Sequence, residues 1–271
     1  MVIDVNGKRT YAYTANHSID PARPAVVFIH GAANDHSVWA LQSRYFGYHG
    51  WNVFAVDLPG HGKSGGKPLS DIGSLADWVA AFMDAAGIAR AAIAGHSMGS
   101  LIGLETAARF SSRVSRLAMI GTAVPMPVSD ALLKSSAAND HVAYEMINAF
   151  AHSPRAQIGG NRVPGMWMMG SSMRLMERSG NGVLHDDFTA CNSYAGGLDA
   201  AAEVMCPVLL VLGQRDLMTP PRAAGEAAAR MGNARTIVLE GTGHSLMSER
   251  PDAVLDALIG FLPDEQTAPA R

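Results

Sequence analysis

Short, mostly apolar runs alternate along most of the chain with longer segments that have a helical pattern. The apolar runs are typical of strands buried on both faces of a parallel sheet, and they cover residues 25–29, 52–56, 91–95, 114–120, 208–212 and 236–239. Between and after them the pattern predicts helices over 38–49, 74–86, 98–110, 221–231 and 251–261. This alternation predicts an α/β fold with a mostly parallel, twisted sheet and helices on both of its faces.

Two segments depart from that alternation. Residues 2–15 alternate apolar and polar positions around Asn6-Gly7, which predicts a hairpin of two antiparallel strands at the start. Residues 123–202 hold 7 of the 15 methionines together with several turn formers and no buried-strand pattern, so we interpret them as an inserted helical lid. The predicted core domain is therefore 1–122 with 203–263, and 264–271 are predicted to be a disordered tail.

Composition narrows the classes of function. A chain of 271 residues that is 48% hydrophobic can bury one large core. The net charge of −3 is spread without a basic stripe, which argues against nucleic-acid binding. The polar N-terminus predicts neither a signal peptide nor a membrane span, and hence a cytoplasmic location. The 2 cysteines and 10 histidines show no metal-ligand spacing, so we expect no metal and no cofactor.

The strongest chemical signal is the stretch Gly95-His96-Ser97-Met98-Gly99, which lies between a predicted strand and a predicted helix. In that setting Gly-x-Ser-x-Gly is typical of a nucleophile elbow, a strained turn that exposes the serine hydroxyl. The amide of Met98 would then face a carbonyl oxygen attacked by Ser97, at the positive end of the following helix.

Four motifs at strand ends give the chain its resemblance to a known family. They are His30-Gly31-Ala32-Ala33, the segment 57–64 (Asp-Leu-Pro-Gly-His-Gly-Lys-Ser), the elbow at 95–99, and Gly213-Gln214-Arg215-Asp216 with Gly243-His244. In this order they make the chain similar, over nearly its whole length, to the α/β-hydrolase superfamily of serine esterases, lactonases and carbon–carbon bond hydrolases with a helical lid. The resemblance implies an α/β-hydrolase fold.

The resemblance and the chemistry together suggest roles for individual residues. Ser97 needs a base to become nucleophilic; His244 fits that role, and Asp216 would orient the imidazole. The amides of Ala32 and Met98 would form the oxyanion hole, with Ala33 as the fallback for Ala32. The resemblance implies that Asp57, His61 and His96 shape loops around the site, and we expect His30 to brace the oxyanion loop.

These residues predict a serine hydrolase that cleaves carboxylic esters of small to medium, largely apolar compounds through an acyl-enzyme. Trp39, Trp167, Met168 and Met169 are the candidates for contacting the substrate. A lactonase, a thioesterase, a carbon–carbon bond hydrolase of ring-cleavage products, and a hydrolase-like receptor with slow turnover remain alternatives. An apolar lid surface would also support a homodimer.

Overall fold

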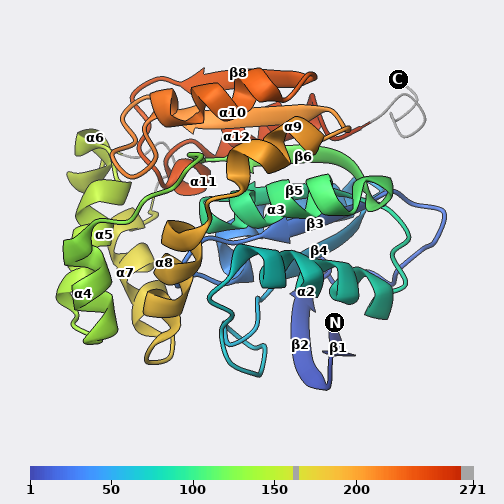
Figure 1. The fold of residues 1–271 in the computed structure, drawn as a ribbon, viewed down its shortest axis with the longest axis horizontal. Coiled ribbons are helices and arrows are strands. Elements are labelled where there is room, and N and C mark those ends of the chain that lie inside the picture. The colour runs from blue at the N-terminus through green and yellow to red at the C-terminus, as the bar shows by residue number, and fades with distance from the viewer. Residues whose placement is uncertain (161–164, 264–271) are drawn as a thin grey trace.

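The computed structural model describes residues 1–160 and 165–263 (Figure 1). Within these ranges the strands form one eight-stranded sheet in the order β1-β2-β4-β3-β5-β6-β7-β8. The strands are β1 (Val2–Val5), β2 (Lys8–Tyr13), β3 (Ala25–Ile29), β4 (Asn52–Val56), β5 (Ala91–His96), β6 (Val114–Ile120), β7 (Val208–Gly213) and β8 (Ala234–Leu239). The strands predicted from apolar runs and the N-terminal hairpin therefore all form.

Strand direction sets where the functional loops lie. β1 pairs antiparallel with β2, and β2 pairs antiparallel with β4. All remaining neighbours pair in parallel, from β4 through β3, β5, β6 and β7 to β8. The carboxyl ends of these six strands therefore share one edge of the sheet, with the end of β5 near its middle. The prediction of a mostly parallel sheet is confirmed.

Helices cover both faces of the sheet and define two apolar cores. One face packs on α1 (Ala40–Tyr48) and α12 (Pro251–Ile259), through residues such as Phe46 and Leu258. The other packs on α2 (Ile72–Ala85), α3 (Met98–Arg109), α9 (Gly197–Glu203) and α10 (Gly225–Arg230). Short 3-10 turns, η1 (His36–Trp39), η2 (Ser111–Arg113) and η3 (Pro221–Ala224), and the one-turn helix α11 (Leu246–Glu249) complete the core.

Five helices between β6 and β7 lie beside the edge where the parallel strands end (Figure 1). They are α4 (Asp130–Ala137), α5 (Val142–Ala151), α6 (Pro154–Gln157), α7 (Met168–Glu177) and α8 (Val183–Ser193), and we call them the inserted helices. Four of them, α4, α5, α7 and α8, share a small apolar cluster that includes Leu132, Met176 and Phe188. The next helix, α9, packs on α3 and α10 instead, although the sequence interpretation placed it in the lid. The domain boundaries stay predictions.

Two other expectations concern the surroundings of the chain. Among the helices of the described residues, none has the length and apolar character needed to cross a membrane. A cytoplasmic location and a homodimer remain predictions from the sequence. The predicted tail, 264–271, lies outside the described residues.

Candidate active site

Ser97 occupies the sharp turn between β5 and α3. Its backbone has φ 53° and ψ −120°, a region that residues other than glycine rarely adopt. The turn is held by hydrogen bonds from Ser97 N to Ile120 O at 2.9 Å and from Ser100 N to Ser97 O at 2.8 Å. Strained backbone of this kind persists only where the surrounding structure over-determines it, which is frequent at functional sites.

The two glycines of the motif are required by close backbone packing. A Cβ atom on Gly95 would collide with the backbone of Gly99, and it would lie 2.7 Å from the backbone nitrogen of Ser100. A Cβ atom on Gly99 would lie 2.6 Å from His30 O, at the end of the neighbouring strand β3. The glycines therefore let the strand, the helix and the loop after β3 converge around Ser97.

Asp216 and His244 lie in the loops that follow β7 and β8, and the sheet edge brings them together. Asp216 Oδ2 is 2.8 Å from His244 Nδ1, and the two residues are only 2% and 5% exposed. Because a carboxylate accepts, His244 carries a proton on Nδ1, so in the neutral tautomer Nε2 holds the lone pair. That arrangement is what a general base requires.

Several donors keep Asp216 ionised. Its Oδ1 accepts hydrogen bonds from the amides of Met218 at 2.9 Å and Thr219 at 2.8 Å, and the Thr219 hydroxyl donates to Oδ2 at 2.7 Å. Burial raises the pKa of Asp216, but the His244 imidazole and these hydrogen bonds lower it by more, so its pKa lies below the ordinary value.

His96 connects the Ser97 turn to the His244 loop. Its ring lies 4.8 Å from the ring of His244, and its Nε2 donates to the His244 carbonyl oxygen at 2.9 Å. Burial and the neighbouring imidazole lower the pKa of His96 to about 3, so the ring is neutral. Within the described residues no hydrogen bond joins the Ser97 hydroxyl to His244.

The loop after β3 presents the candidate oxyanion donors. Ala32 lines the same cavity as Ser97. The amide of Ala33 already donates to Asp187 Oδ2 at 2.8 Å, which removes it as the fallback donor. His30 braces this loop, since its Nδ1 donates to Gly31 O at 2.8 Å and its Nε2 accepts from Leu58 N at 3.1 Å. Burial and the nearby His61 lower the pKa of His30 to about 4, consistent with a neutral ring.

A cavity of about 420 Å³ lies beside Ser97, between the sheet edge and the inserted helices. Its wall is mostly apolar, and Phe150 and Leu217, which are 43% and 68% exposed, lie where it meets solvent. The lining residues are Ala32, Ser97, Met126, Pro127, Val128, Ser129, Leu132, Phe150, Phe188, Cys191, Leu217, Met218 and Thr219. An apolar wall with a few polar groups at one end suits a small organic ligand.

The four residues predicted to contact substrate do not line this cavity. Trp39 is fully buried because the turn η1 directs it onto the sheet, 5.1 Å from the ring of Phe28. Trp167, the residue before α7, is 69% exposed, and its ring packs over Gly170. Met168 lines another cavity, of about 330 Å³, whose lining also includes His96 and Ser245. The carbonyl of Met169 accepts a hydrogen bond from Asn148. Trp39 therefore has no surface that a ligand could contact, and the assignment of Trp167, Met168 and Met169 to substrate contact stays a prediction.

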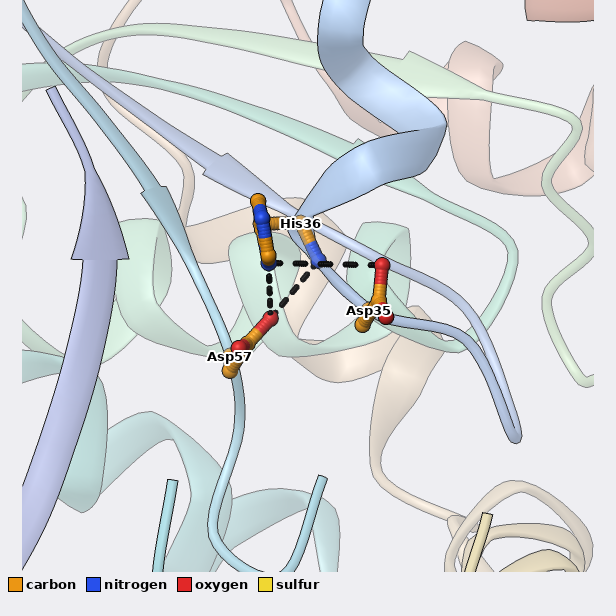
Figure 2. A group of neighbouring side chains, drawn as sticks. All are labelled: Asp35, His36 and Asp57. Carbon is orange, nitrogen blue, oxygen red and sulfur yellow. Dashed lines mark hydrogen bonds and ion pairs between the residues drawn. The ribbon is translucent and has the colours of Figure 1, made fainter. Parts of the chain in front are cut away.

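A second polar cluster joins Asp35, His36 and Asp57 (Figure 2). The Asp57 carboxylate accepts hydrogen bonds from three groups: His36 N and Nδ1, each at 2.7 Å, and Lys63 N at 2.8 Å. Asp35 accepts from Ser37 N at 2.8 Å and from Arg178 at 2.7 Å. These bonds hold the loop after β4 against η1. Because N–H donors already engage the carboxylates, the cluster gives no reason to expect a metal.

Sequence reasoning missed two polar residues. Thr219 positions Asp216, and its place three residues after that aspartate was the only local signal. Asp187 belongs to a helix far along the chain, and the sequence offered no sign that it would be buried while its neighbour Asp186 is not.

Comparisons with known proteins agree with this architecture. Residues 26–257 match the family described as "Alpha/beta hydrolase family". The chain is 29% identical over 255 residues to a pimeloyl-acyl-carrier protein methyl ester esterase of Neisseria meningitidis serogroup B, covering 84% of this chain and 88% of the relative. It is 24% identical over 271 residues to (E)-2-((N-methylformamido)methylene)succinate hydrolase of Acinetobacter baylyi, covering 96% and 97%.

Solved structures show the same fold. The enol-lactonase of Burkholderia xenovorans LB400 superposes with a TM-score of 0.83 at 23% identity, covering 97% of this chain and all of that one. An esterase from Exiguobacterium antarcticum superposes with a TM-score of 0.80 at 18% identity, covering 96% and 97%.

Proposed function

Because the chain belongs to the α/β-hydrolase family, we propose that it is a serine hydrolase of carboxylic esters with small to medium, largely apolar substrates. The observation that carries this proposal is the buried Asp216–His244 pair, positioned by adjacent loops of the sheet edge where Ser97 is exposed to an apolar cavity. Esterase and hydrolase names among the relatives agree with the reaction class.

The proposed reaction follows from the proton positions. His244 Nε2 takes the proton of Ser97 as the hydroxyl oxygen attacks the ester carbonyl. Asp216 stabilises the imidazolium that forms, and the amides of Ala32 and Met98 donate to the carbonyl oxygen as it gains negative charge. The imidazolium then protonates the departing alcohol. Water, activated by the same imidazole, releases the acid and restores the Ser97 hydroxyl.

The cavity favours apolar acyl or alcohol groups. Met126, Leu132 and Phe188 form part of its wall, and the described lining includes no charged side chain. The same catalytic groups can attack thioesters, lactones and vinylogous diketones. Turnover measurements on these substrate classes would therefore show to which branch of the family the protein belongs.

The direct test combines labelling with turnover. A fluorophosphonate is expected to label Ser97, and the purified protein is expected to hydrolyse a short-chain p-nitrophenyl ester. Ser97→Ala should abolish labelling and lower kcat by about 10⁶-fold. A parallel panel of esters, thioesters, lactones and vinylogous diketones would rank the substrate classes. Full turnover in Ser97→Ala would disprove the proposed mechanism, whereas saturable ligand binding with negligible turnover would indicate a receptor.

A further inference from the structure

Asp187 is a buried carboxylate of the inserted helix α8 that contacts the turn carrying the proposed oxyanion donor. The residue is 1% exposed. Its Oδ2 accepts a hydrogen bond from the amide of Ala33 at 2.8 Å and lies 2.9 Å from His61 Nε2. The bond to Ala33 spans 154 positions of the sequence and joins an inserted helix directly to the loop after β3.

The turn that Asp187 contacts has a conformation that its residues do not favour. It is closed by Asn34 N, which donates to Gly31 O at 3.3 Å. Its third residue, Ala33, has φ 52°, where turns usually place glycine because a Cβ atom is crowded. The hydrogen bond from Ala33 to Asp187 therefore stabilises a backbone orientation that alanine alone would resist.

The partner of Asp187 is a protonated histidine. His61 Nδ1 faces Pro59 O at 2.9 Å, and Nε2 faces Asp187 Oδ2. Both neighbours are acceptors, and a neutral imidazole has only one N–H, so the ring carries both protons. Burial lowers the pKa of His61, but the charge of Asp187 and the hydrogen bonds raise it by more. Asp57 adds to this effect, while His30, 4.9 Å away, stays neutral.

The two oxygens of Asp187 are used unequally. Oδ2 serves both His61 and Ala33, whereas Oδ1 is buried without a hydrogen-bond partner among the described residues. A carboxylate that only fastened a helix would gain stability by satisfying both oxygens. Here both donors instead bind Oδ2, and this fixes the position of that oxygen next to the turn.

We propose that Asp187 is a positioning residue that orients the turn 31–34, so that the Ala32 amide faces the cavity and the oxyanion hole depends on the docking of α8. This inference rests on the proposed function. Phe188 and Cys191, from the same helix, line the Ser97 cavity. Docking of α8 would therefore assemble the substrate wall and the oxyanion donor together.

The test is Asp187→Asn, which preserves the shape of the side chain but removes its negative charge, so that the His61 imidazolium loses its counter-ion and the hydrogen bond from the Ala33 amide is weakened. We would measure kcat and KM on p-nitrophenyl butyrate, and the Ki of a trifluoromethyl ketone, whose adduct with serine mimics the oxyanion. Because the donor is displaced and not deleted, kcat and ketone affinity should fall together by about tenfold to hundredfold, with KM within about twofold. Asp186→Asn, at the half-buried neighbouring position on α8, should match the wild type in all three.

A merely structural role would lower thermal stability, or raise KM through the altered cavity wall, without the parallel fall in kcat and ketone affinity. That result, or unchanged values, would overturn the inference.

If Asp187→Asn does not fold, His61→Gln replaces it. This variant keeps an N–H donor without the charge, and a smaller but still parallel fall in kcat and ketone affinity is expected. Loss of turnover in Ser97→Ala with no parallel fall in either variant would refute the role of Asp187 alone. Full turnover in Ser97→Ala would refute the proposed function itself.

Discussion

The edge of the parallel sheet and the inserted helices contribute to one site in different ways. At the sheet edge, backbone pairing between β7 and β8 sets the positions of the loops that carry Asp216 and His244. The inserted helices share a small apolar cluster that also includes Ala33 of the loop after β3, and they make several polar contacts with the edge. The comparison teaches that the proposed triad is positioned by the loops of the sheet, whereas the inserted helices, which lie beside that edge (Figure 1), contribute part of the cavity wall through residues such as Leu132 and Phe188.

The polar contacts between the inserted helices and the sheet edge lie at two loops of the proposed site. Asp187 reaches the turn after β3. Near the other end of the site, Glu249 Oε1 accepts from Gly243 N at 3.2 Å and from Ser153 N at 3.1 Å, and Ser245 N donates to Ala151 O at 2.9 Å. The inserted helices are thus tied to both the proposed oxyanion turn and the His244 loop.

The largest effect that would separate the two regions is expected at the sheet edge. Asp216→Asn should lower kcat by about 10⁴-fold, because the imidazole loses the acceptor that sets its tautomer. Steady-state kinetics on p-nitrophenyl butyrate, with circular dichroism to verify folding, would measure this. Asp199→Asn, whose side chain is 92% exposed on α9, is the control and should behave like the wild type. Turnover within a few-fold of the wild type in Asp216→Asn would exclude that residue from the mechanism.

An intermediate effect, on the pH dependence of the free energy of unfolding, is expected from the neutral, buried histidines of the sheet edge. The folded pKa values of His30 and His96 are lowered to about 4 and about 3 from the ordinary 6.5. Between pH 6.5 and about 4 the unfolded chain therefore binds more protons, so acid should reduce the free energy of unfolding by up to about 1.4 kcal/mol per pH unit for each group. The pKa of His61 is raised, so its effect on the free energy of unfolding has the opposite sign and falls above this window. Its stabilising contribution is complete below pH 6.5 and is lost as the pH rises.

Urea denaturation at pH 7, 6 and 5 would measure this slope. His96→Asn removes one titrating group, and its free energy of unfolding should depend less steeply on pH than that of the wild type. An identical slope in the variant and the wild type would contradict the assignment of a neutral, buried His96.

The smallest effect is expected within the inserted helices. Phe188→Leu enlarges the cavity and should raise the ratio of octanoate to acetate ester hydrolysis by about four- to fifteenfold, which corresponds to burying one or two further methylene groups at about 0.8 kcal/mol each. Trp167→Ala is the comparison, because this exposed side chain lies outside the cavity, and its chain-length profile should stay unchanged. A reversed outcome, with Trp167 controlling chain length, would mean that substrate binds elsewhere on these helices.

Most of the core could be predicted from the chain because strands buried on both faces give continuous apolar runs. The predicted helix over 98–110 forms as α3 (Met98–Arg109), and the predicted helix over 74–86 forms as α2 (Ile72–Ala85). The surroundings of the predicted substrate contacts could not be read from the sequence in the same way. An aromatic or methionine side chain reads the same in a sequence whether it faces the sheet, as Trp39 does, or solvent, as Trp167 does.

The sequence by itself determined the strand-and-helix alternation and the turn at Ser97, because apolar periodicity and glycine spacing are local properties of the chain. Only the tertiary structure decided which carboxylates are buried and what they hold. Asp187 and Asp186 are adjacent and chemically identical, yet one faces His61 and Ala33 while the other is half-exposed. That difference arises from the rotation of α8 against the sheet edge, which depends on contacts between residues more than 100 positions apart.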